Sequence, residues 1–415
     1  MNKKILIISS SFCLLMGLVS FSNPINYASS TKDIFSDASS SEVKTYYSNL
    51  KDGLKGEDLL DLLETIIKTG HTEVSSSQGG SSWSYYLLLD RDYVKDPLSD
   101  EEKSTQKWKT DDVVCSPLYD TTLTYKASDK PGTKYIDREH VLPKSYGFGN
   151  KDGSTFLPYA ATDMHNLHMG EKKNNENGHN NYAFGNVKDK ASSTQITSTI
   201  SGNVTGYLGE NTSGILVYEP MDKDKGDIAR TIFYMATRYH TYDSSTDNSP
   251  ALKLSDTPTK EVYESKVTLA AIDTKDTPCE YGMLSDLLKW NVSDPVDDHE
   301  IHRNNLVYNA VQGNRNPYID YPSWANSAFG TDATGIDTSV APTQFGDTTT
   351  DPTDPSEPET PETPSEDTTE DPWYIKLIQD KYFPWYCVLA IILLLSLISF
   401  MIGKKHKRKS KNKKK

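Results

Sequence analysis

Residues 347–372 (DTTTDPTDPSEPETPETPSEDTTEDP) most strongly limit what the chain can fold into. The segment holds ten acidic residues, no basic residues and almost no apolar side chains. Such a composition cannot bury enough apolar surface to offset the conformational entropy that folding removes. Proline and charge repulsion both extend the segment. We therefore expect a disordered stalk here, with a folded head in the residues before it.

The N-terminus has the pattern of an export signal. Two lysines precede an apolar run over residues 5–19, and small and polar residues follow. This order is typical of a secretory signal peptide, which we expect to occupy residues 1–28. Cleavage near Ser22 and cleavage near Ala28 both fit the pattern.

A second apolar run lies near the C-terminus. Residues 385–403 carry no charge, and a helix of that length, at about 1.5 Å per residue, nearly spans the hydrocarbon core. Residues 404–415 carry nine Lys and Arg, and such basic flanks tend to stay in the cytoplasm. The sequence thus predicts a single-pass protein of the cell membrane, with a cytoplasmic tail and an extracellular head. Residues 332–384 then form the stalk and the juxtamembrane segment.

The expected head is acidic. The whole chain has a formal net charge of −14, and because many basic residues lie at the two ends, the head itself is near −16. This charge argues against sequence-independent coating of nucleic acid, which depends on a basic surface. It leaves room for an enzyme that binds a polyanion through metal ions and a local basic groove.

The head, residues 45–331, is long enough for one large domain. Apolar residues at helical spacing predict helices over 54–71 and 225–240, and two helices separated by a proline over 284–313. Residues 134–182 are rich in Asn, Gly and His, and their short apolar pieces indicate strands and loops. The fold class is therefore α+β with helices dominant. No internal repeat or protein partner is indicated, and we expect a monomer.

Only two cysteines, Cys115 and Cys279, lie in the expected head. A disulfide between them suits an exported protein. Two buried free thiols are an equally good interpretation, and the sequence does not decide between them.

The residues best suited to catalysis lie between positions 138 and 181. Four of the nine histidines fall there, with Glu139 and a run of asparagines. Histidine can accept a proton near neutral pH, and carboxylate and amide oxygens are the ligands that Mg²⁺ prefers. Adjacent residues of an extended strand point to opposite sides. Glu139 can therefore face a metal while His140 reaches a water molecule on another side.

The same region resembles a known family. DREHVLPKSYGFG (137–149) is similar to the REHVWPKSHG signature of the bacterial endonuclease I family, secreted nonspecific nucleases with a ββα-metal, or His-Me finger, active site. Residues 162–185 resemble its TDLHHLRPADxxVNSxRSNYPFG block, and the segment ending in QGNRNPYIDYP resembles its QGNRNPFIDHP. The resemblance covers about residues 50–330 in the same order. It implies a mostly helical domain around a ββα-metal core.

The resemblance also implies a reaction and a set of site residues. It assigns the general base to His140 and the metal ligands to Glu139 and Asn175. The expected cofactor is Mg²⁺, with Mn²⁺ and Ca²⁺ as alternatives. The expected reaction is hydrolysis of DNA, and in the wider case RNA, without strong sequence specificity, to 5′-phosphate and 3′-hydroxyl ends. Arg138 and Arg315 are expected to bind the substrate, although a conformational role in a tight turn is equally open for Arg315.

The chain departs from the family pattern near the second metal ligand. It has one residue more between Asp163 and the Asn181-Tyr182 pair, so counting back from Asn181 reaches Glu176 rather than Asn175. Asn174 and Asn177 therefore remain rival ligands. The arginine of NSxRSN is missing, with Gly178 and His179 in that region, and Leu142 replaces a tryptophan.

Other interpretations of these residues stay open. A surface adhesin on a decayed nuclease fold is the main alternative function. A zinc hydrolase would need a site built from histidines, although structural hydrogen bonds are the better interpretation for two of them, His165 and His168. A solvated surface position or an ion pair is the default for Arg230 and Arg238 in the helix over 225–240. The histidines that a zinc site would draw on are His140, His165, His168 and His179.

Overall fold

The computed structural model describes residues 33–74, 81–120, 123–126, 135–146, 159–241, 251–258 and 279–346. The predicted signal peptide, transmembrane helix and cytoplasmic tail lie outside the described residues, as does the stalk from residue 347 on. Within the described ranges, no helix is both long enough and apolar enough to cross a membrane.

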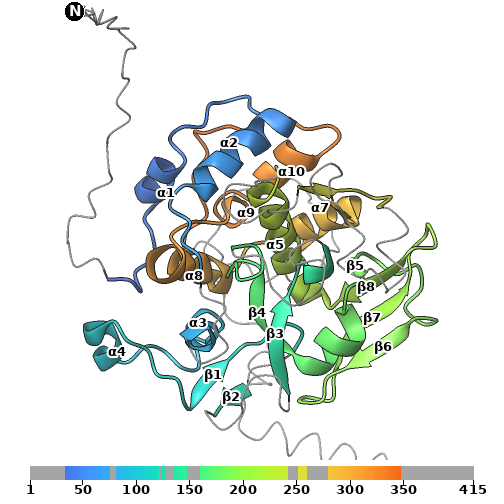
Figure 1. Ribbon diagram of the computed structural model, residues 1–415, viewed down its shortest axis with the longest axis horizontal. Coiled ribbons are helices and arrows are strands. Elements are labelled where there is room, and N and C mark those ends of the chain that lie inside the picture. The colour runs from blue at the N-terminus through green and yellow to red at the C-terminus, as the bar shows by residue number, and fades with distance from the viewer. Residues whose placement is uncertain are drawn as a thin grey trace, which may run out of the picture. The chain divides into compact units, whose positions relative to one another are not determined.

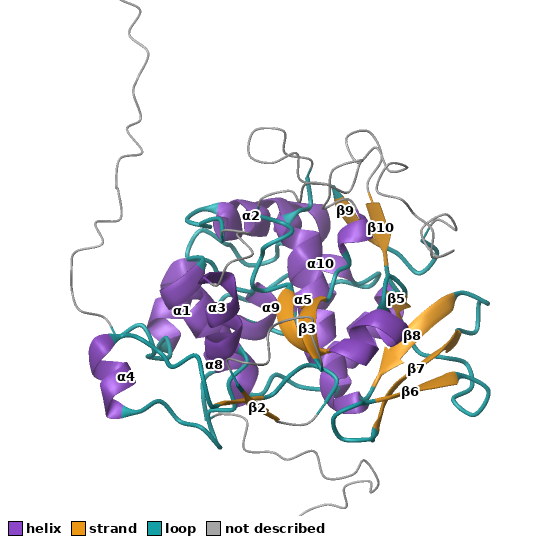
Figure 2. Ribbon diagram, turned by 60° about the horizontal axis from the view of Figure 1, so that its bottom comes forward, coloured by secondary structure: helices purple, strands orange, loops and turns teal. Residues whose placement is uncertain are grey.

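Helices and short strands are both present, which confirms the α+β fold class (Figures 1 and 2). The helices are α1 Ser40–Tyr46, α2 Gly56–Lys68, α3 Ser81–Leu89, α4 Asp100–Thr105, α5 Lys225–Arg238, α7 Leu284–Ser293, α8 Asp298–Leu306, α9 Pro317–Asp320 and α10 Trp324–Phe329. The strands are β1 Val113–Cys115, β2 Leu123–Tyr125, β3 Ile136–His140, β4 Leu167–Glu171, β5 Ala183–Phe184, β6 Thr194–Thr197, β7 Val204–Glu210, β8 Leu216–Pro220, β9 Leu252–Leu254 and β10 Cys279–Tyr281.

Helix α5 lies at the centre of the domain and packs against α2, α7 and α9. The predicted helix is confirmed, but it is buried on nearly all sides rather than along one stripe. Arg230 is fully buried and forms two hydrogen bonds of 2.6 Å to Glu300. Arg238 is also buried and donates to Nδ1 of His71 at 2.9 Å. The solvated alternative is therefore wrong for both residues. The ion-paired alternative is confirmed for Arg230 by its salt bridge to Glu300.

The helices expected over residues 54–71 and 284–313 are also confirmed, as α2 and as α7 followed by α8. The break between α7 and α8 contains Pro295, and α8 then starts with a capping box between Asp297 and Glu300. After α8 a π-helix runs over Val307–Val311, and Gly313 has a φ of +80°, which favours glycine.

The residues that carry the family resemblance lie in and around a two-stranded sheet. Strands β3 and β4 pair antiparallel, with Glu139 opposite His168. A short helical segment that includes a π-helix over Asn174–His179 follows β4 directly, which gives a ββα order. The four-stranded sheet β5-β8-β7-β6 lies on one side of this unit, and α3 and α8 lie on the other (Figures 1 and 2). That larger sheet was not predicted.

The described fold continues past residue 331, into residues that the sequence assigns to the stalk. Ile336 is 3% exposed and exchanges backbone hydrogen bonds with Gly53 and Leu54. Thr343 donates its backbone N–H to the carbonyl of Asp320.

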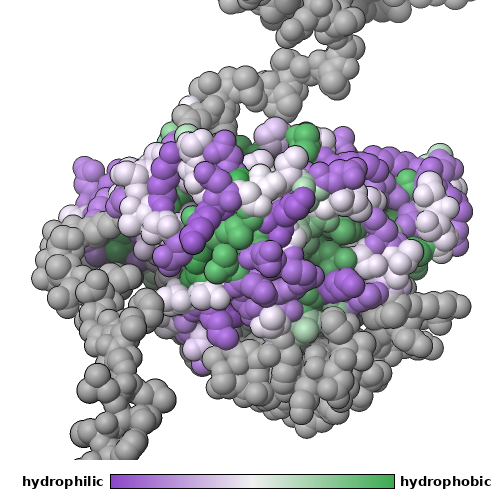
Figure 3. Space-filling view, turned by 90° about the horizontal axis from the view of Figure 1, so that it is seen from above, coloured by the Kyte–Doolittle hydropathy of each residue, from purple (hydrophilic) through white to green (hydrophobic). Residues whose placement is uncertain are grey.

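On the face seen in Figure 3, apolar areas are small and separated by polar side chains. Cys115 and Cys279 are buried free thiols, which is one of the two interpretations that the sequence left open.

Candidate active site

Glu139 and His140 end strand β3 and face different surroundings. Glu139 is 0% exposed, and its Oε1 accepts hydrogen bonds from His179 Nδ1 at 2.6 Å and from the Tyr119 hydroxyl at 3.1 Å. Its Oε2 is buried and has no hydrogen-bond partner among the residues that the structure describes. A buried carboxylate oxygen without a partner is costly, and coordination of a cation would remove that cost. This atom therefore suits a metal ligand.

His140 is held as a neutral base. Its Nε2–H donates to the carbonyl oxygen of Ala161 at 2.9 Å, since a carbonyl can only accept. That bond places the ring proton on Nε2 and leaves the lone pair on Nδ1. Burial, and then the positive charge of Lys144, lower the pKa of His140 to about 3. The imidazole is therefore unprotonated at neutral pH and can accept a proton at Nδ1.

Asn175 is the asparagine that contacts the backbone at the end of β3. Its Nδ2 donates to the carbonyl oxygen of Arg138 at 3.1 Å, and the side chain is half-buried. Asn174 is fully buried, and its Oδ1 accepts from Thr205 and Tyr218 at 2.7 Å each. Asn177 is exposed. The contacts therefore favour Asn175 over its two rivals.

The π-helix over Asn174–His179 accounts for the extra residue in the sequence. Its backbone bond runs from Asn180 N–H to the Asn175 carbonyl at 3.0 Å, five residues apart instead of four. Such a turn contains one residue more than an α-helical turn. Counting forward to Asn175 and counting back to His179 are then both consistent with the family pattern. By the second count, His179 stands where the pattern has its arginine.

Two further polar residues support the site and were not singled out from the sequence. Glu171 is buried, and its Oε2 accepts from the backbone N–H and Nδ2 of Asn174 at 2.9 and 2.8 Å, which fixes the start of the π-helix. Asn166 bonds both backbone groups of Leu142 and so holds the loop after His140. Glu171 aligns with the acid of the family's LRPAD, a signal that could have identified it.

Basic side chains surround His140 although the head is acidic. Arg138 is exposed, and it lies two residues before His140, on the same side of β3. Lys144 follows on a short 3₁₀ turn, and burial and the charge of Arg138 lower its pKa. These charges form a local basic region of the kind that a phosphate backbone would contact.

Arg315, the other arginine expected to bind substrate, lies in a different environment from the exposed Arg138. The residue is buried, and its Nε and Nη2 donate to both carboxylate oxygens of Asp320 at 2.8 and 2.6 Å. Nη1 donates to Asn305 at 2.9 Å. The guanidinium is thus engaged within the fold, and the conformational role is the interpretation that these contacts favour.

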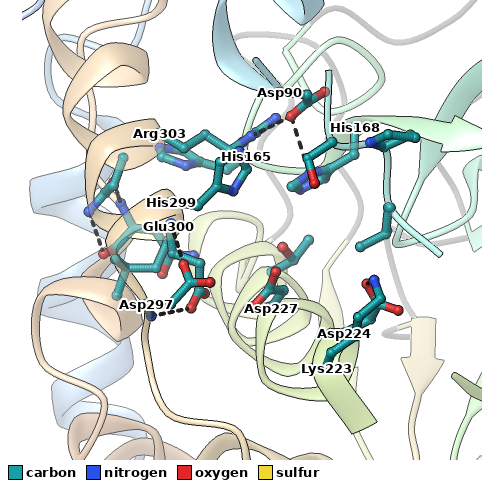
Figure 4. Close-up of a pocket in the computed structure, with 17 residues that line it drawn as sticks. Asp90, His165, His168, Lys223, Asp224, Asp227, Asp297, His299, Glu300 and Arg303 are labelled. Carbon is teal, nitrogen blue, oxygen red and sulfur yellow. Dashed lines mark hydrogen bonds and ion pairs between the residues drawn. The ribbon is translucent and has the colours of Figure 1, made fainter. Parts of the chain in front are cut away.

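Two of the remaining histidines, His165 and His168, line a cavity of about 220 Å³ together with His299 (Figure 4). His165 donates from Nε2 to the carbonyl of Asn314 at 3.2 Å. Asp163 accepts four hydrogen bonds and holds the loop before β4. Within the part of the chain that the structure describes, no three His, Cys, Asp or Glu side chains are placed to hold a metal. The zinc alternative therefore finds no site there.

Comparison with known proteins identifies the same family that the sequence motifs resemble. The endonuclease I family model matches residues 56–323. The chain is 34% identical over 291 residues to an extracellular ribonuclease of Bacillus amyloliquefaciens, covering 69% of this chain and 78% of the relative. An extracellular ribonuclease of Bacillus subtilis strain 168 is 32% identical over 287 residues, with the same coverage. No solved structure matches the chain. The chain belongs to the endonuclease I family and is a nuclease.

Proposed function

We propose that this nuclease hydrolyses phosphodiester bonds outside the cell with a divalent cation held by Glu139 and Asn175. The observation that carries the proposal is the buried Oε2 of Glu139, which has no hydrogen-bond partner among the described residues. Asn175 bonds the backbone carbonyl of the preceding residue, Arg138, and the next residue in sequence carries a neutral imidazole. Carboxylate and amide oxygens suit Mg²⁺, which retains several waters, and Mn²⁺ and Ca²⁺ are alternatives. When bound, the cation would stabilise negative charge on the phosphate in the transition state.

The chain's own side chains supply the remaining steps. Nδ1 of His140 takes a proton from the water that attacks phosphorus, while the Ala161 carbonyl keeps the ring in the required tautomer. Arg138 and Lys144 bind the phosphate backbone and position it against His140. Attack by water with departure of the 3′-oxygen leaves a 5′-phosphate and a 3′-hydroxyl.

We propose RNA as a substrate together with DNA. Two relatives carry the name extracellular ribonuclease, which supports RNA, and the family name supports internal cleavage. The contacts expected at the site are to phosphate, which carries no sequence information. We therefore expect cleavage without strong sequence preference.

The proposed location is the outer face of the cell membrane. Residues 385–403 would span the membrane, the acidic stalk would hold a monomeric catalytic domain away from it, and residues 404–415 would remain in the cytoplasm. Protease treatment of intact cells should release a fragment of the size of the head into the medium. Recovery of the active head only after cell lysis would contradict this location.

The nuclease proposal is tested by incubating the full-length chain with plasmid DNA and with RNA, in Mg²⁺ or in EDTA. We expect cleavage that needs the cation and is lost in Glu139→Gln and His140→Ala. The products should accept a radioactive 5′-phosphate from polynucleotide kinase only after phosphatase treatment. A decayed fold that serves as an adhesin would bind without cutting, and the same assay would show it.

A further inference from the structure

We propose that His179 is a positioning residue that holds the Glu139 carboxylate so that Oε2 is presented to the cation. This inference rests on the proposed function, because it assigns a role within the same metal site. It also concerns a residue in which this chain departs from the family pattern, where an arginine stands.

The contact between the two side chains is short and fully enclosed. His179 Nδ1–H donates to Oε1 of Glu139 at 2.6 Å, and both side chains are 0% exposed. Tyr119 donates to the same oxygen at 3.1 Å. With Oε1 bound by two donors, the carboxylate cannot rotate freely, and Oε2 is the oxygen left without a partner in the described part of the chain. Partners of this kind orient metal ligands and set metal affinity.

The imidazole of His179 is itself fixed on two further sides. Its ring stacks on Phe184, with centroids 4.1 Å apart and planes 14° from parallel. Its Nε2 lies 3.2 Å from the Tyr281 hydroxyl, which donates its own proton to the carbonyl of Tyr182 at 3.1 Å. Both ring nitrogens thus lie at hydrogen-bond distance from a partner, so the ring orientation is determined.

The π-helix links this support to the second proposed ligand. Asn175 and His179 lie on the same short element, four positions apart, and both contact the end of β3. Asn175 bonds the backbone just before Glu139, and His179 bonds its carboxylate. The extra residue of this chain lies between them. One element thus sets the separation of the two proposed ligands, Glu139 and Asn175. The buried His179 orients the Glu139 carboxylate at the place where the family pattern has an arginine.

A purely structural ion pair would predict a different outcome from a positioning role. Loss of a structural pair would lower stability and leave metal affinity unchanged in the protein that folds. Loss of a positioning bond would weaken metal binding in a folded protein. Asparagine and glutamine separate these cases, because the asparagine amide nitrogen lies near the place of Nδ1, whereas the glutamine amide nitrogen lies near the place of Nε2.

The test measures Mn²⁺ binding to the full-length chain by the electron paramagnetic resonance signal of free Mn²⁺. Variants are His179→Asn, His179→Gln and Tyr281→Phe, each checked for folding by circular dichroism. We expect His179→Gln to bind Mn²⁺ about 10–100-fold more weakly, and His179→Asn and Tyr281→Phe to stay within about threefold of wild type. Activity of His179→Gln should recover when Mn²⁺ is raised to saturation.

Equal Mn²⁺ affinity in the asparagine and glutamine variants would overturn the positioning role. Glu139→Gln tells this failure from failure of the proposed function. If Glu139→Gln loses the Mn²⁺ site while both His179 variants keep it, the metal site stands and the role of His179 falls. If Glu139→Gln binds Mn²⁺ like wild type, the proposed metal site itself is wrong.

Discussion

His140 is joined to Ala161 by a hydrogen bond from Nε2–H to the backbone carbonyl oxygen, 2.9 Å long. Because the acceptor is a backbone atom, the bond fixes both the orientation of the ring and its tautomer. Nδ1 then carries the lone pair, while burial keeps the pKa of the imidazole near 3. Nε2–H serves as the donor, and Nδ1 remains available to take a proton from water.

Substitution of His140 tests this assignment. We expect His140→Ala to lower kcat by about 10²–10⁴-fold, because a positioned general base contributes about that much. Mn²⁺ affinity should change little, since Glu139 and Asn175 remain. His165→Gln is the matched control, because the ring of that buried histidine donates to the Asn314 carbonyl and glutamine can do the same. The kcat of this variant should stay near wild type. Wild-type hydrolysis by His140→Ala would refute the role.

The three neighbouring asparagines give a second prediction, with controls built into the chain. Asn175→Ala should weaken metal affinity and leave the melting temperature nearly unchanged, because the side chain is half-buried and makes one hydrogen bond. Asn174→Ala should cost at least about 1–3 kcal/mol of stability, since Glu171, Thr205 and Tyr218 would lose a buried partner. Asn177→Ala should change neither quantity. Loss of metal affinity in Asn177→Ala alone would move the ligand to that position.

The different surroundings of Glu139 and His140 could be predicted from the sequence, because local geometry determines them. Glu139 and His140 are adjacent on a strand, so their opposite orientation follows from strand geometry alone. The long helices were also predictable, since the apolar spacing of α2 and α5 requires burial. The choice among asparagines was not, because it depends on a π-helical turn that no periodic pattern signals.

Burial of charged residues was the other feature that the sequence could not supply. Arginine is usually a surface residue, so the sequence does not predict that Arg315 and Arg230 are buried. Their partners, Asp320 and Glu300, are identified only by the three-dimensional structure. The four-stranded sheet was missed because β6 and β7 are rich in threonine and glycine and lack a regular apolar alternation. Burial of Ile336 likewise depends on backbone bonds to residues 53 and 54, which no local pattern indicates.

The two arginines first assigned to substrate should behave differently. Arg315→Ala should destabilise the fold by about 3–5 kcal/mol, because it leaves the buried carboxylate of Asp320 without its bidentate partner. Arg138→Ala should leave the melting temperature near wild type but raise KM. The salt dependence of KM should become weaker, as expected when an exposed phosphate contact is lost. An unchanged melting temperature for Arg315→Ala would show that the buried pair contributes little.

The free thiols predict how the protein responds to reductant. Cys115 and Cys279 are buried and unbonded, and burial raises the pKa of the Cys279 thiol to about 12, so neither is a reactive thiolate at neutral pH. The melting temperature should be the same with and without dithiothreitol. A fall that corresponds to about 2–4 kcal/mol would instead indicate a disulfide in the head.

Two buried histidines predict loss of stability in mild acid. Burial lowers the pKa of His71 to about 4 and that of His165 to about 3, from an ordinary value of 6.5. Below pH 6.5 the unfolded chain therefore binds protons that the folded chain does not, and the free energy of unfolding falls with pH until the folded pKa is reached. Each histidine contributes a slope of up to about 1.4 kcal/mol per pH unit in that window.

Urea unfolding of the full-length chain at pH 7.5, 6.5, 5.5 and 4.5 should show this fall. His165→Gln keeps a donor toward Asn314 and His71→Asn keeps an acceptor for Arg238, and each should flatten the slope. An equally steep slope in the double variant would assign the acid sensitivity to other groups.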